Sequence, residues 1–368
     1  MNHTLSWIIL LLLGSDLARA TDRVVGPTSL YSSIGEALLA SSDGDRLLIE
    51  PGMYREDISI SKSVSLLPNQ EGGRFYITGN VKIANASGKS ITISGMRLGG
   101  YVLKDGACTG RTDVRVMDCN VPYVDLVDPY IHACLLRDTI GGQVQLSSGE
   151  VIGNEVLGVA GFAAGIFFQG ASSLPDEIWV VGNSLGVGLP GLGISIASDL
   201  RYHVENNFVR SPAGYPALNV QRSYSIITAQ CTVLNNTFYR ATTASSYAAT
   251  ATNMNPFGVI VRNNALIGFT AGMGIGESHY SNVSTTASSI ALSTGAPSMG
   301  SPLINAGDPD PRYLDLDLTT NDVGCYGGSN SRANFTTGMG SAVVGFMQAP
   351  RVVAQGEVVN INATGFDR

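Results

Sequence analysis

The chain has 368 residues and a formal net charge of −7, with 22 Lys and Arg against 29 Asp and Glu. An acidic chain lacks the positive surface that binds nucleic acid, so nucleic acid is excluded as a partner. Glycine is frequent, at 44 residues, whereas charged residues make up only 14% of the chain. This composition indicates many turns and many short strands.

The first 20 residues have the pattern of a secretory signal peptide. An apolar run at residues 7–13 is too short to cross a bilayer, and Ala18-Arg19-Ala20 follows it as a small-x-small cleavage site. We expect cleavage before Thr21 and no transmembrane segment in the remaining chain. The expected location is secreted, periplasmic or at the cell surface.

Residues 34–40 are predicted to form a short helix. Ser33 and Glu36 have the spacing of a capping box, and three apolar residues would share one face of the helix. Such a helix can cover the open end of a stack of strands, where a bare edge would be exposed to water.

A short pattern then recurs: alternating apolar residues, a turn often containing Asn, and one closing apolar residue. Clear copies are residues 91–98, 114–121, 178–185, 202–208, 231–238 and 259–266, and weaker copies end at Ile140 and Val156. The closing positions are 16 to 30 residues apart, with a mean of 24, which is typical of a solenoid. The period-2 alternation predicts strands, and stacking of successive coils would close a continuous core.

We therefore predict an all-β fold, a parallel β-helix (solenoid) over residues 21–329 with the short helix as its N-terminal cap. Inward-facing positions should stack in one core on successive strands; we expect this of Val116, Val180, Val204, Val233 and Val261. Asn suits the bends because it tolerates positive φ, and stacked Asn side chains can form a hydrogen-bonded ladder. The hairpins of a β-sandwich would favour Asn-Gly turns, and the sequence contains none.

The composition changes after Ser329. Residues 330–349 are polar and rich in glycine at their start and are expected to form a linker. Residues 350–368 resemble the first strands of an Ig-like β-sandwich, but 19 residues are too few for that fold, so they could instead form a C-terminal β tail. The odd number of cysteines, five without metal-site spacing, favours buried free thiols over a set of disulfides.

The stretch 44–56, with Gly-Asp, an apolar strand and Pro-Gly-Met-Tyr-Arg-Glu, resembles the first coil of the pectin lyase-like family of right-handed parallel β-helices. Residues 301–308 and 321–328 resemble the closing coil of its exported bacterial members. The resemblance covers about residues 21–330. It implies the right-handed fold and an extracellular polysaccharide as the partner, whereas these motifs do not define an activity.

The motifs that mark known activities of this family are absent. The sequence lacks the Gly-His-Gly of polygalacturonases, the Leu-Gly-Arg-Pro-Trp phrase of pectin methylesterases and the Trp-x-Asp-His phrase of pectate lyases. The sequence therefore leaves open whether the chain is an enzyme.

A cluster of polar residues nevertheless suggests a catalytic site. Asp125, Asp128, His132, Arg137 and Asp138 fall within 14 residues of a chain that is otherwise poor in charge. Such groups could abstract a proton from a uronate ring and neutralise the charge that develops, with His132 or the nearby tyrosine exchanging the proton. The competing interpretation is that these residues are solvated turn residues.

A second cluster suggests a metal site. Asp308, Asp310, Asp315 and Asp317, followed by Asp322, could bind Ca²⁺, which is the only cofactor candidate. The alternative is that these carboxylates cap turns. Tyrosines that could stack on sugar rings form a third set: Tyr101, Tyr123, Tyr130, Tyr202, Tyr215 and Tyr224.

The leading functional hypothesis is an exported polysaccharide-associated β-helix protein that binds an extracellular glycan, and lyase-like or epimerase-like processing of that glycan is left open. The rival hypothesis is a non-catalytic cell-surface or adhesive scaffold. An Asp/His/Arg cluster on one outward face would favour the first, and faces lined only by Ser, Thr and Asn would favour the second.

Overall fold

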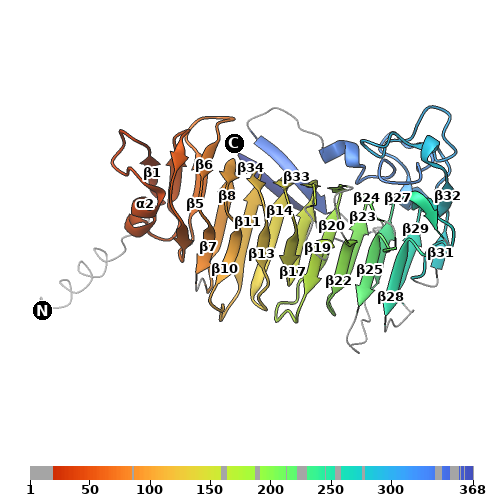
Figure 1. The fold of residues 1–368 in the computed structure, drawn as a ribbon, viewed down its shortest axis with the longest axis horizontal. Coiled ribbons are helices and arrows are strands. Elements are labelled where there is room, and N and C mark those ends of the chain that lie inside the picture. Colours follow the sequence, from red (N-terminus) through yellow and green to blue (C-terminus); the bar gives the residue numbers. More distant parts are fainter. Residues whose placement is uncertain are drawn as a thin grey trace, which may run out of the picture.

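The computed structural model describes residues 20–335 except 85–86, 159–163, 187–190, 213, 222–229, 245, 253–257 and 276–277, together with residues 342–348, 356, 358–359 and 361–367. In this part of the chain, three long parallel sheets wrap around one axis (Figure 1). The chain is a right-handed parallel β-helix, as the sequence predicts. The expected signal peptide lies almost wholly outside the described residues.

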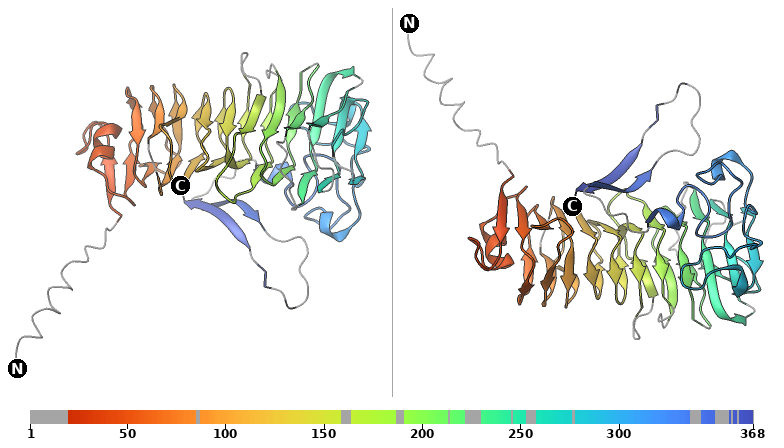
Figure 2. Two further views of the ribbon diagram at one scale, coloured as in Figure 1. Left: turned by 90° about the horizontal axis from the view of Figure 1, so that it is seen from below. Right: turned by 90° about the horizontal axis from the view of Figure 1, so that it is seen from above.

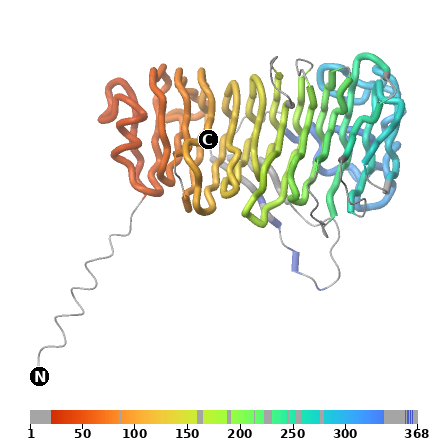
Figure 3. The backbone as a smooth tube through the Cα atoms, turned by 60° about the horizontal axis from the view of Figure 1, so that its bottom comes forward, coloured from red at the N-terminus to blue at the C-terminus, as the bar shows by residue number. Residues whose placement is uncertain are grey.

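From β2 to β28 each coil contributes one strand to each sheet, in the order A, B, C, and the chain then returns to sheet A one coil further along (Figure 3); β1 and the last two coils lack a sheet C strand among the described residues. Sheet A contains β1 (Asp22–Val25), β2 (Arg46–Ile49), β5 (Ser65–Pro68), β8 (Ser90–Ser94), β11 (Thr112–Met117), β14 (Ile131–Leu136), β17 (Ser148–Ile152), β20 (Ile178–Val181), β23 (Tyr202–Glu205), β26 (Cys231–Leu234), β29 (Val259–Arg262) and β31 (Ser278–Tyr280).

Sheet B is made of short strands that follow the bend after sheet A. It contains β3 (Met53–Tyr54), β6 (Phe75–Ile77), β9 (Met96–Leu98), β12 (Asn120–Val121), β15 (Thr139–Ile140), β18 (Glu155–Val156), β21 (Ser184–Leu185), β24 (Phe208–Arg210), β27 (Thr237–Ala244), β30 (Ala265–Phe269) and β32 (Val283–Thr285).

Sheet C completes each coil. It contains β4 (Ile58–Ile60), β7 (Val81–Ala84), β10 (Val102–Asp105), β13 (Val124–Leu126), β16 (Val144–Leu146), β19 (Ala164–Gln169), β22 (Leu192–Ala197), β25 (Leu218–Gln221) and β28 (Ala249–Thr252).

The core is a stack of inward-facing apolar side chains, as predicted. In sheet A, Val180 pairs with Val204, Val204 with Val233, and Val233 with Val261, and each of these side chains is fully buried. Val116 belongs to the same row through two intervening coils. Period-2 alternation in each strand thus becomes one continuous apolar column.

The bend from sheet A to sheet B carries two different asparagine positions. The first has positive φ, as in Asn206 (56°), Asn235 (53°) and Asn263 (56°). The second forms a buried ladder: the Asn207 amide donates to Asn236 Oδ1 at 3.1 Å, and the Asn236 amide donates to Asn264 Oδ1 at 2.9 Å. The predicted conformational and ladder roles are both present, but they belong to adjacent residues.

The N-terminal end is covered by α2 (Ile34–Ala40), which is the helix predicted from the capping box. Ser33 is its N-cap and accepts a hydrogen bond from the Glu36 amide. The carboxylate of Glu56 accepts hydrogen bonds from the amides of Ile34 and Gly35, both at 2.9 Å. The glutamate of the Pro-Gly-Met-Tyr-Arg-Glu phrase therefore has a structural role, because it satisfies free amides at the helix N-terminus.

After the last coil, residues 303–335 run back along the A–B bends; we call this segment the C-terminal strap. It contains η2 (Pro311–Tyr313) and η3 (Arg332–Phe335), and η1 (Ala287–Ser289) precedes it. The strap makes hydrogen bonds with successive bends: Asn263 accepts from the Asp308 amide at 2.8 Å, and Asn206 donates to the Gly327 carbonyl at 2.6 Å.

The segment 330–349, expected to be a linker, contains two ordered elements. Its first part is η3, and its last part is β33 (Ala342–Gln348). β33 pairs antiparallel with β34 (Asn362–Asp367), and this hairpin stands off one side of the β-helix (Figure 2). The first strand of the β tail therefore lies before the predicted start at residue 350, within the segment expected to be a linker.

All five cysteines are buried and free, which agrees with the interpretation of them as small apolar residues. None of the helices in the described part of the chain has the length and apolar character needed to span a membrane.

Candidate functional site

The five residues of the predicted catalytic cluster do not form one site. Asp125 lies on β13 in sheet C, whereas His132 lies on β14 in sheet A. Asp128 is buried in the turn between them, where it pairs with Lys104 at 3.2 Å and accepts from the Tyr130 amide at 3.0 Å. Fourteen residues cover most of one coil, so neighbours in sequence face different sides of the solenoid.

Arg137 and Asp138 lie at the next bend and have structural roles. Arg137 has a positive φ of 54° and pairs with the Asp118 carboxylate at 3.0 Å. Asp138 is buried, and its Oδ1 accepts from the Cys119 amide at 2.7 Å. Asp138 thus occupies the ladder position that Asn fills in later coils, and it does not face solvent.

His132 does line a hollow on the outer face of sheet A. The hollow has a volume of about 180 Å³, and its walls come from consecutive strands of sheet A and the turn before β11. Its polar lining residues are Arg111, Asp113, Arg115, His132, Cys134 and Glu150. We call it the His132 pocket; residues at alternate positions of β11, β14 and β17 point outward into it, as the pleat requires.

The charges of the His132 pocket are organised by Asp176, which precedes β20. His132 Nδ1 lies 2.9 Å from Asp176 Oδ2, and Arg111 lies 2.9 Å from Asp176 Oδ1. Arg111 also pairs with Asp113 at 2.9 Å. Arg115, in contrast, is exposed and has no ion pair or hydrogen-bonded partner among the described residues. One guanidinium in the pocket is therefore available to an anionic ligand.

Cys134 is a poor nucleophile. It is buried, and burial together with the neighbouring Glu150 carboxylate raises the pKa of its thiol well above the ordinary value. A thiol held in its neutral form contributes shape to the pocket and no covalent chemistry.

A network of polar and aromatic groups continues the same face beyond Glu150. The Trp179 and His203 rings are stacked, with centroids 3.8 Å apart. His203 Nε2 lies 3.1 Å from Glu177 Oε2, and this contact, together with Arg201, lowers the pKa of Glu177 to about 2. The outer face of sheet A thus gathers aromatic and ionisable side chains in one row over the coils from β11 to β23.

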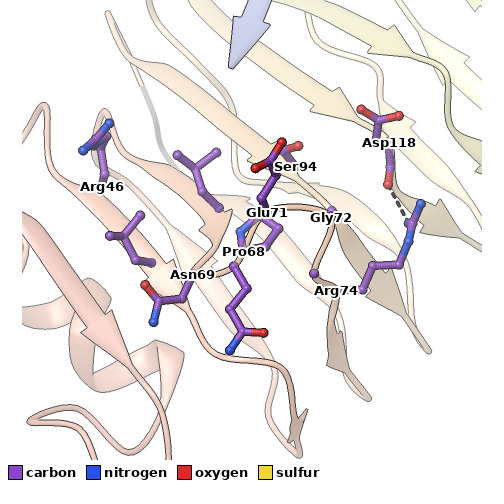
Figure 4. A pocket seen from close by; sticks show the side chains of 13 residues that line it. Arg46, Pro68, Asn69, Glu71, Gly72, Arg74, Ser94 and Asp118 are labelled. Carbon is purple, nitrogen blue, oxygen red and sulfur yellow. Dashed lines mark hydrogen bonds between the residues drawn. The ribbon is translucent and has the colours of Figure 1, made fainter. Parts of the chain in front are cut away.

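A second hollow, of about 260 Å³, lies on the N-terminal part of this face (Figure 4). Leu48, Leu67 and Pro68 form apolar walls, and the loop 69–74 closes one side. Arg74 donates to the Asp118 carbonyl at 2.7 Å and so fixes the loop to the bend of a later coil. We call this hollow the Leu67 pocket.

The predicted calcium ligands each have a partner, either within the strap or on the neighbouring strand β29. Asp308 pairs with Arg262, Asp310 pairs with Arg312 at 2.5 Å, and Asp317 accepts from the Thr319 amide at 3.1 Å. Asp315 accepts from the amides of Asp322 and Gly328. Within the described residues, no group of three or more His, Cys, Asp or Glu could hold a metal ion, which favours the alternative of turn capping.

The candidate tyrosines also differ in position. Tyr101 and Tyr215 are exposed, Tyr123 and Tyr130 are half-buried, Tyr202 is fully buried, and Tyr224 lies outside the described residues. Tyr101 and Tyr123, which directly precede β10 and β13 of sheet C, make an edge-to-face pair with centroids 5.5 Å apart.

Four residues of the His132 pocket were not predicted from the sequence: Arg111, Asp113, Arg115 and Glu150. Arg111, Asp113 and Arg115 occur close together in the sequence, which is unusual in a chain with so few charges. Glu150 carries no such signal, because only the register of β14 with β17 brings it to the pocket.

No protein-family model matches the chain, and no curated protein sequence matches it. Among solved structures, the crystal structure of pectate lyase Pel9A is similar to this chain, with a TM-score of 0.44 and 13% sequence identity over 83% of this chain and 96% of that chain. The sheet topology itself gives the fold class, which is a right-handed parallel β-helix.

Proposed function

We propose that the protein is exported and binds a uronate-containing polysaccharide along the outer face of sheet A, with the His132 pocket as the central subsite. The observation that carries this proposal is the outward Asp/His/Arg cluster around an unpaired guanidinium, Arg115. A guanidinium binds a carboxylate through two parallel hydrogen bonds, which suits the acidic group of a uronate.

The local charge matters because the whole chain is acidic, with a net charge of −7 that opposes an acidic polymer. Arg111 is held by Asp113 and Asp176, so it contributes little attraction. Recognition of a uronate therefore depends mainly on Arg115.

We also propose that the pocket processes the bound uronate. In this proposal His132 is the general base, and the Asp176 carboxylate, whose Oδ2 lies 2.9 Å from Nδ1 without hydrogen-bond geometry, is close enough to stabilise the imidazolium that forms. In this step His132 Nε2 takes the proton from C5, and the electron pair left on C5 delocalises onto the carboxylate paired with Arg115. Elimination of the C4 oxygen, which takes up a proton, gives a C4–C5 double bond. Return of a proton to the opposite face of C5 gives the epimer.

The first experiment measures binding of purified protein to a panel of uronate oligosaccharides by calorimetry. Arg115→Ala should weaken binding by about ten- to a hundredfold, since a hydrogen bond to a charged group contributes about 1.5–3 kcal/mol. Arg97→Ala, which removes an exposed arginine from β9 in sheet B, is the matched control and should bind like wild type. Equal binding by all three proteins would contradict the proposal.

The second experiment separates processing from binding. Wild type and His132→Ala are assayed for unsaturated products by ultraviolet absorbance and for C5 epimers by NMR. We expect turnover by wild type and a loss of about a hundredfold or more in His132→Ala, with binding retained. Binding without turnover in wild type would support the non-catalytic scaffold instead.

A further inference from the structure

We propose that His203 is a positioning residue for the His132 pocket. Through Glu177 it holds the turn that places the Asp176 carboxylate beside the general base. This inference rests on the proposed function and adds to it a residue outside the pocket. His203 lies on β23, three strands along sheet A from the β14 strand of His132, and it is not among the residues that line the pocket (Figure 1).

Two adjacent carboxylates in the turn before β20 reach in opposite directions along the solenoid. Asp176 reaches toward the N-terminal coils: its Oδ1 accepts from Arg111 at 2.9 Å, and its Oδ2 lies 2.9 Å from His132 Nδ1. Glu177 reaches toward the next coil, where its Oε2 lies 3.1 Å from His203 Nε2. Both side chains are thus anchored to neighbouring coils, so a displacement of one moves the backbone that carries the other.

The ring of His203 is a fixed anchor. It is buried, it stacks on Trp179 with centroids 3.8 Å apart, and its Nδ1 lies 2.8 Å from the Thr232 hydroxyl. The His203 hydrogen bond, with the Arg201 charge, lowers the pKa of Glu177 to about 2, so this carboxylate is ionised at neutral pH. Because an ionised carboxylate only accepts hydrogen bonds, His203 Nε2 carries a hydrogen and donates it. Arg201, the other partner of Glu177, is partly exposed to solvent and holds it less rigidly.

The position of Asp176 matters to the proposed reaction because His132 becomes positively charged when it takes the proton from C5. The Asp176 carboxylate, 2.9 Å from Nδ1, opposes that charge. Attraction between charges weakens with distance, and a displacement of about 1 Å can cost about a hundredfold in rate. The charge forms only as the proton moves, so the attraction stabilises the transition state more than the bound uronate. Loss of the anchor should therefore lower kcat and leave KM nearly unchanged.

Three variants separate positioning from stability. His203→Phe keeps a ring to stack on Trp179 and removes the donor to Glu177. His203→Gln returns a donor, its Nε2, at a similar reach from the backbone. Thr232→Val is the matched control, because it removes the hydroxyl group on the other side of the His203 ring and leaves the contact with Glu177. A role in stability alone would give similar effects in His203→Phe and Thr232→Val.

The first measurement is turnover of the uronate substrate, at a temperature where melting curves show every variant folded. We expect kcat of His203→Phe to fall about tenfold, with KM within about twofold of wild type. His203→Gln should recover kcat to within about threefold of wild type, and Thr232→Val should match wild type. Equal losses of kcat in His203→Phe and Thr232→Val, or a change in KM alone, would overturn the inference.

The second measurement does not need turnover. The ring nitrogens of His132 are followed by long-range ¹H–¹⁵N NMR and assigned with His132→Ala. Their signals should shift in His203→Phe and stay as in wild type in Thr232→Val, because only the first variant displaces Asp176. Such a shift in a protein that processes no uronate would uphold the link from His203 to Asp176 and overturn the processing step of the proposed function. Turnover by wild type, with kcat and the His132 signals unchanged in His203→Phe, would overturn this inference alone.

Discussion

The backbone amide of Asp138 donates to Oδ1 of Asn154 at 2.8 Å. Asp138 thus holds, with a carboxyl group, the position in the buried ladder at the A–B bends that asparagines occupy in the later coils. In the next coils each ladder amide group donates twice: Asn154 Nδ2 donates to the Leu135 carbonyl and to Asn183 Oδ1, both at 3.0 Å. The equivalent atom of Asp138, Oδ2, is buried and makes no hydrogen bond within the described residues. An ionised carboxylate there faces positions that require a donor.

Asp138→Asn should therefore stabilise the protein. Burial raises the pKa of Asp138 well above its ordinary value, and the Asp118 carboxylate acts in the same direction against the Cys119 hydrogen bond. The folded protein then binds a proton that the unfolded chain releases near pH 4, so the stability contributed by Asp138 is lost as pH rises from about 4. We expect a gain of about 1–3 kcal/mol for Asp138→Asn near pH 7 that shrinks toward pH 4.

The measurement is urea denaturation of wild type and Asp138→Asn at several pH values. Asp125→Asn, which changes a half-buried carboxylate of sheet C outside the ladder, is the control and should show no such gain. A gain that does not vary with pH, or a loss of stability, would show that ionisation of the buried Asp138 carboxyl group does not lower the stability of the folded protein.

Glu177 should give the opposite dependence on pH. Its hydrogen bond to His203, with the Arg201 charge, lowers its pKa to about 2 from the ordinary value of 4.5. The stability from this carboxylate is present above about pH 4.5 and is lost as pH falls toward 2. Glu177→Gln should lower the melting temperature by roughly 1–3 °C at neutral pH, since the pair is partly solvated. The difference should vanish near pH 2 in thermal scans; a constant difference would show that the charge is not responsible.

The sequence predicted the fold because the signals that define it are local. Alternation within each strand fixed which valines are buried, and the Ser33 cap fixed the helix. The site could not be predicted in the same way. Which residues meet across coils depends on turn lengths and strand register, so His132 meets Asp176, 44 positions away, and not Arg137. The strand β33, in the segment expected to be a linker, was not predicted for a similar reason, because it pairs with β34, which lies further along the chain.

The residue type at each bend depends on what the strap places over it. At Asn206, Asn235 and Asn263 the side chains bond to the strap, whereas Gly182 lies beneath the ring of Phe335. A Cβ added at Gly182 would lie 2.2 Å from Phe335 Cδ2, and its φ is +68°. Gly182→Ala should therefore destabilise the protein by about 2 kcal/mol or more, through backbone strain and displacement of the ring.

A double-mutant cycle separates these two causes. In a Phe335→Ala background the ring is absent, so Gly182→Ala should cost only the backbone term of about 1–2 kcal/mol. The coupling between the two sites, measured by chemical denaturation, should be about 0.5–1 kcal/mol or more. If the losses of unfolding free energy in the two single variants simply add in the double variant, the Phe335 ring of the strap does not pack against Gly182.

Val204→Asp tests the apolar column itself. Val204 is fully buried between Val180 and Val233 on the neighbouring strands, so an aspartate there would be an unpaired charge in the core. The expected cost is about 3 kcal/mol or more, measured by urea denaturation. Val24→Asp, at an exposed outward position of β1, is the control and should change stability by less than about 0.5 kcal/mol. Similar losses of unfolding free energy in the two variants would show that Val204 does not lie in a buried apolar column.

The adjacent residues Asn235 and Asn236 should respond differently to substitution by glycine. Asn235 has positive φ, which glycine adopts freely, and it loses only its bonds to the strap, including the one to Asn321 Oδ1 at 2.7 Å. Asn236 is fully buried in the ladder: its Nδ2 donates to the Val204 carbonyl at 2.8 Å and to Asn264 Oδ1 at 3.0 Å.

Asn235→Gly should therefore cost about 1 kcal/mol, whereas Asn236→Gly should cost about 3 kcal/mol or more, because it leaves a carbonyl and an amide of neighbouring coils without partners inside the core. Urea denaturation gives both values. Hydrogen exchange adds a second test: the Asn207 amide, which donates to Asn236 Oδ1, should lose protection in Asn236→Gly and keep it in Asn235→Gly. Equal costs, or unchanged protection of Asn207 in both variants, would show that the ladder does not stabilise the stack, and the two positions would then be equivalent bend residues.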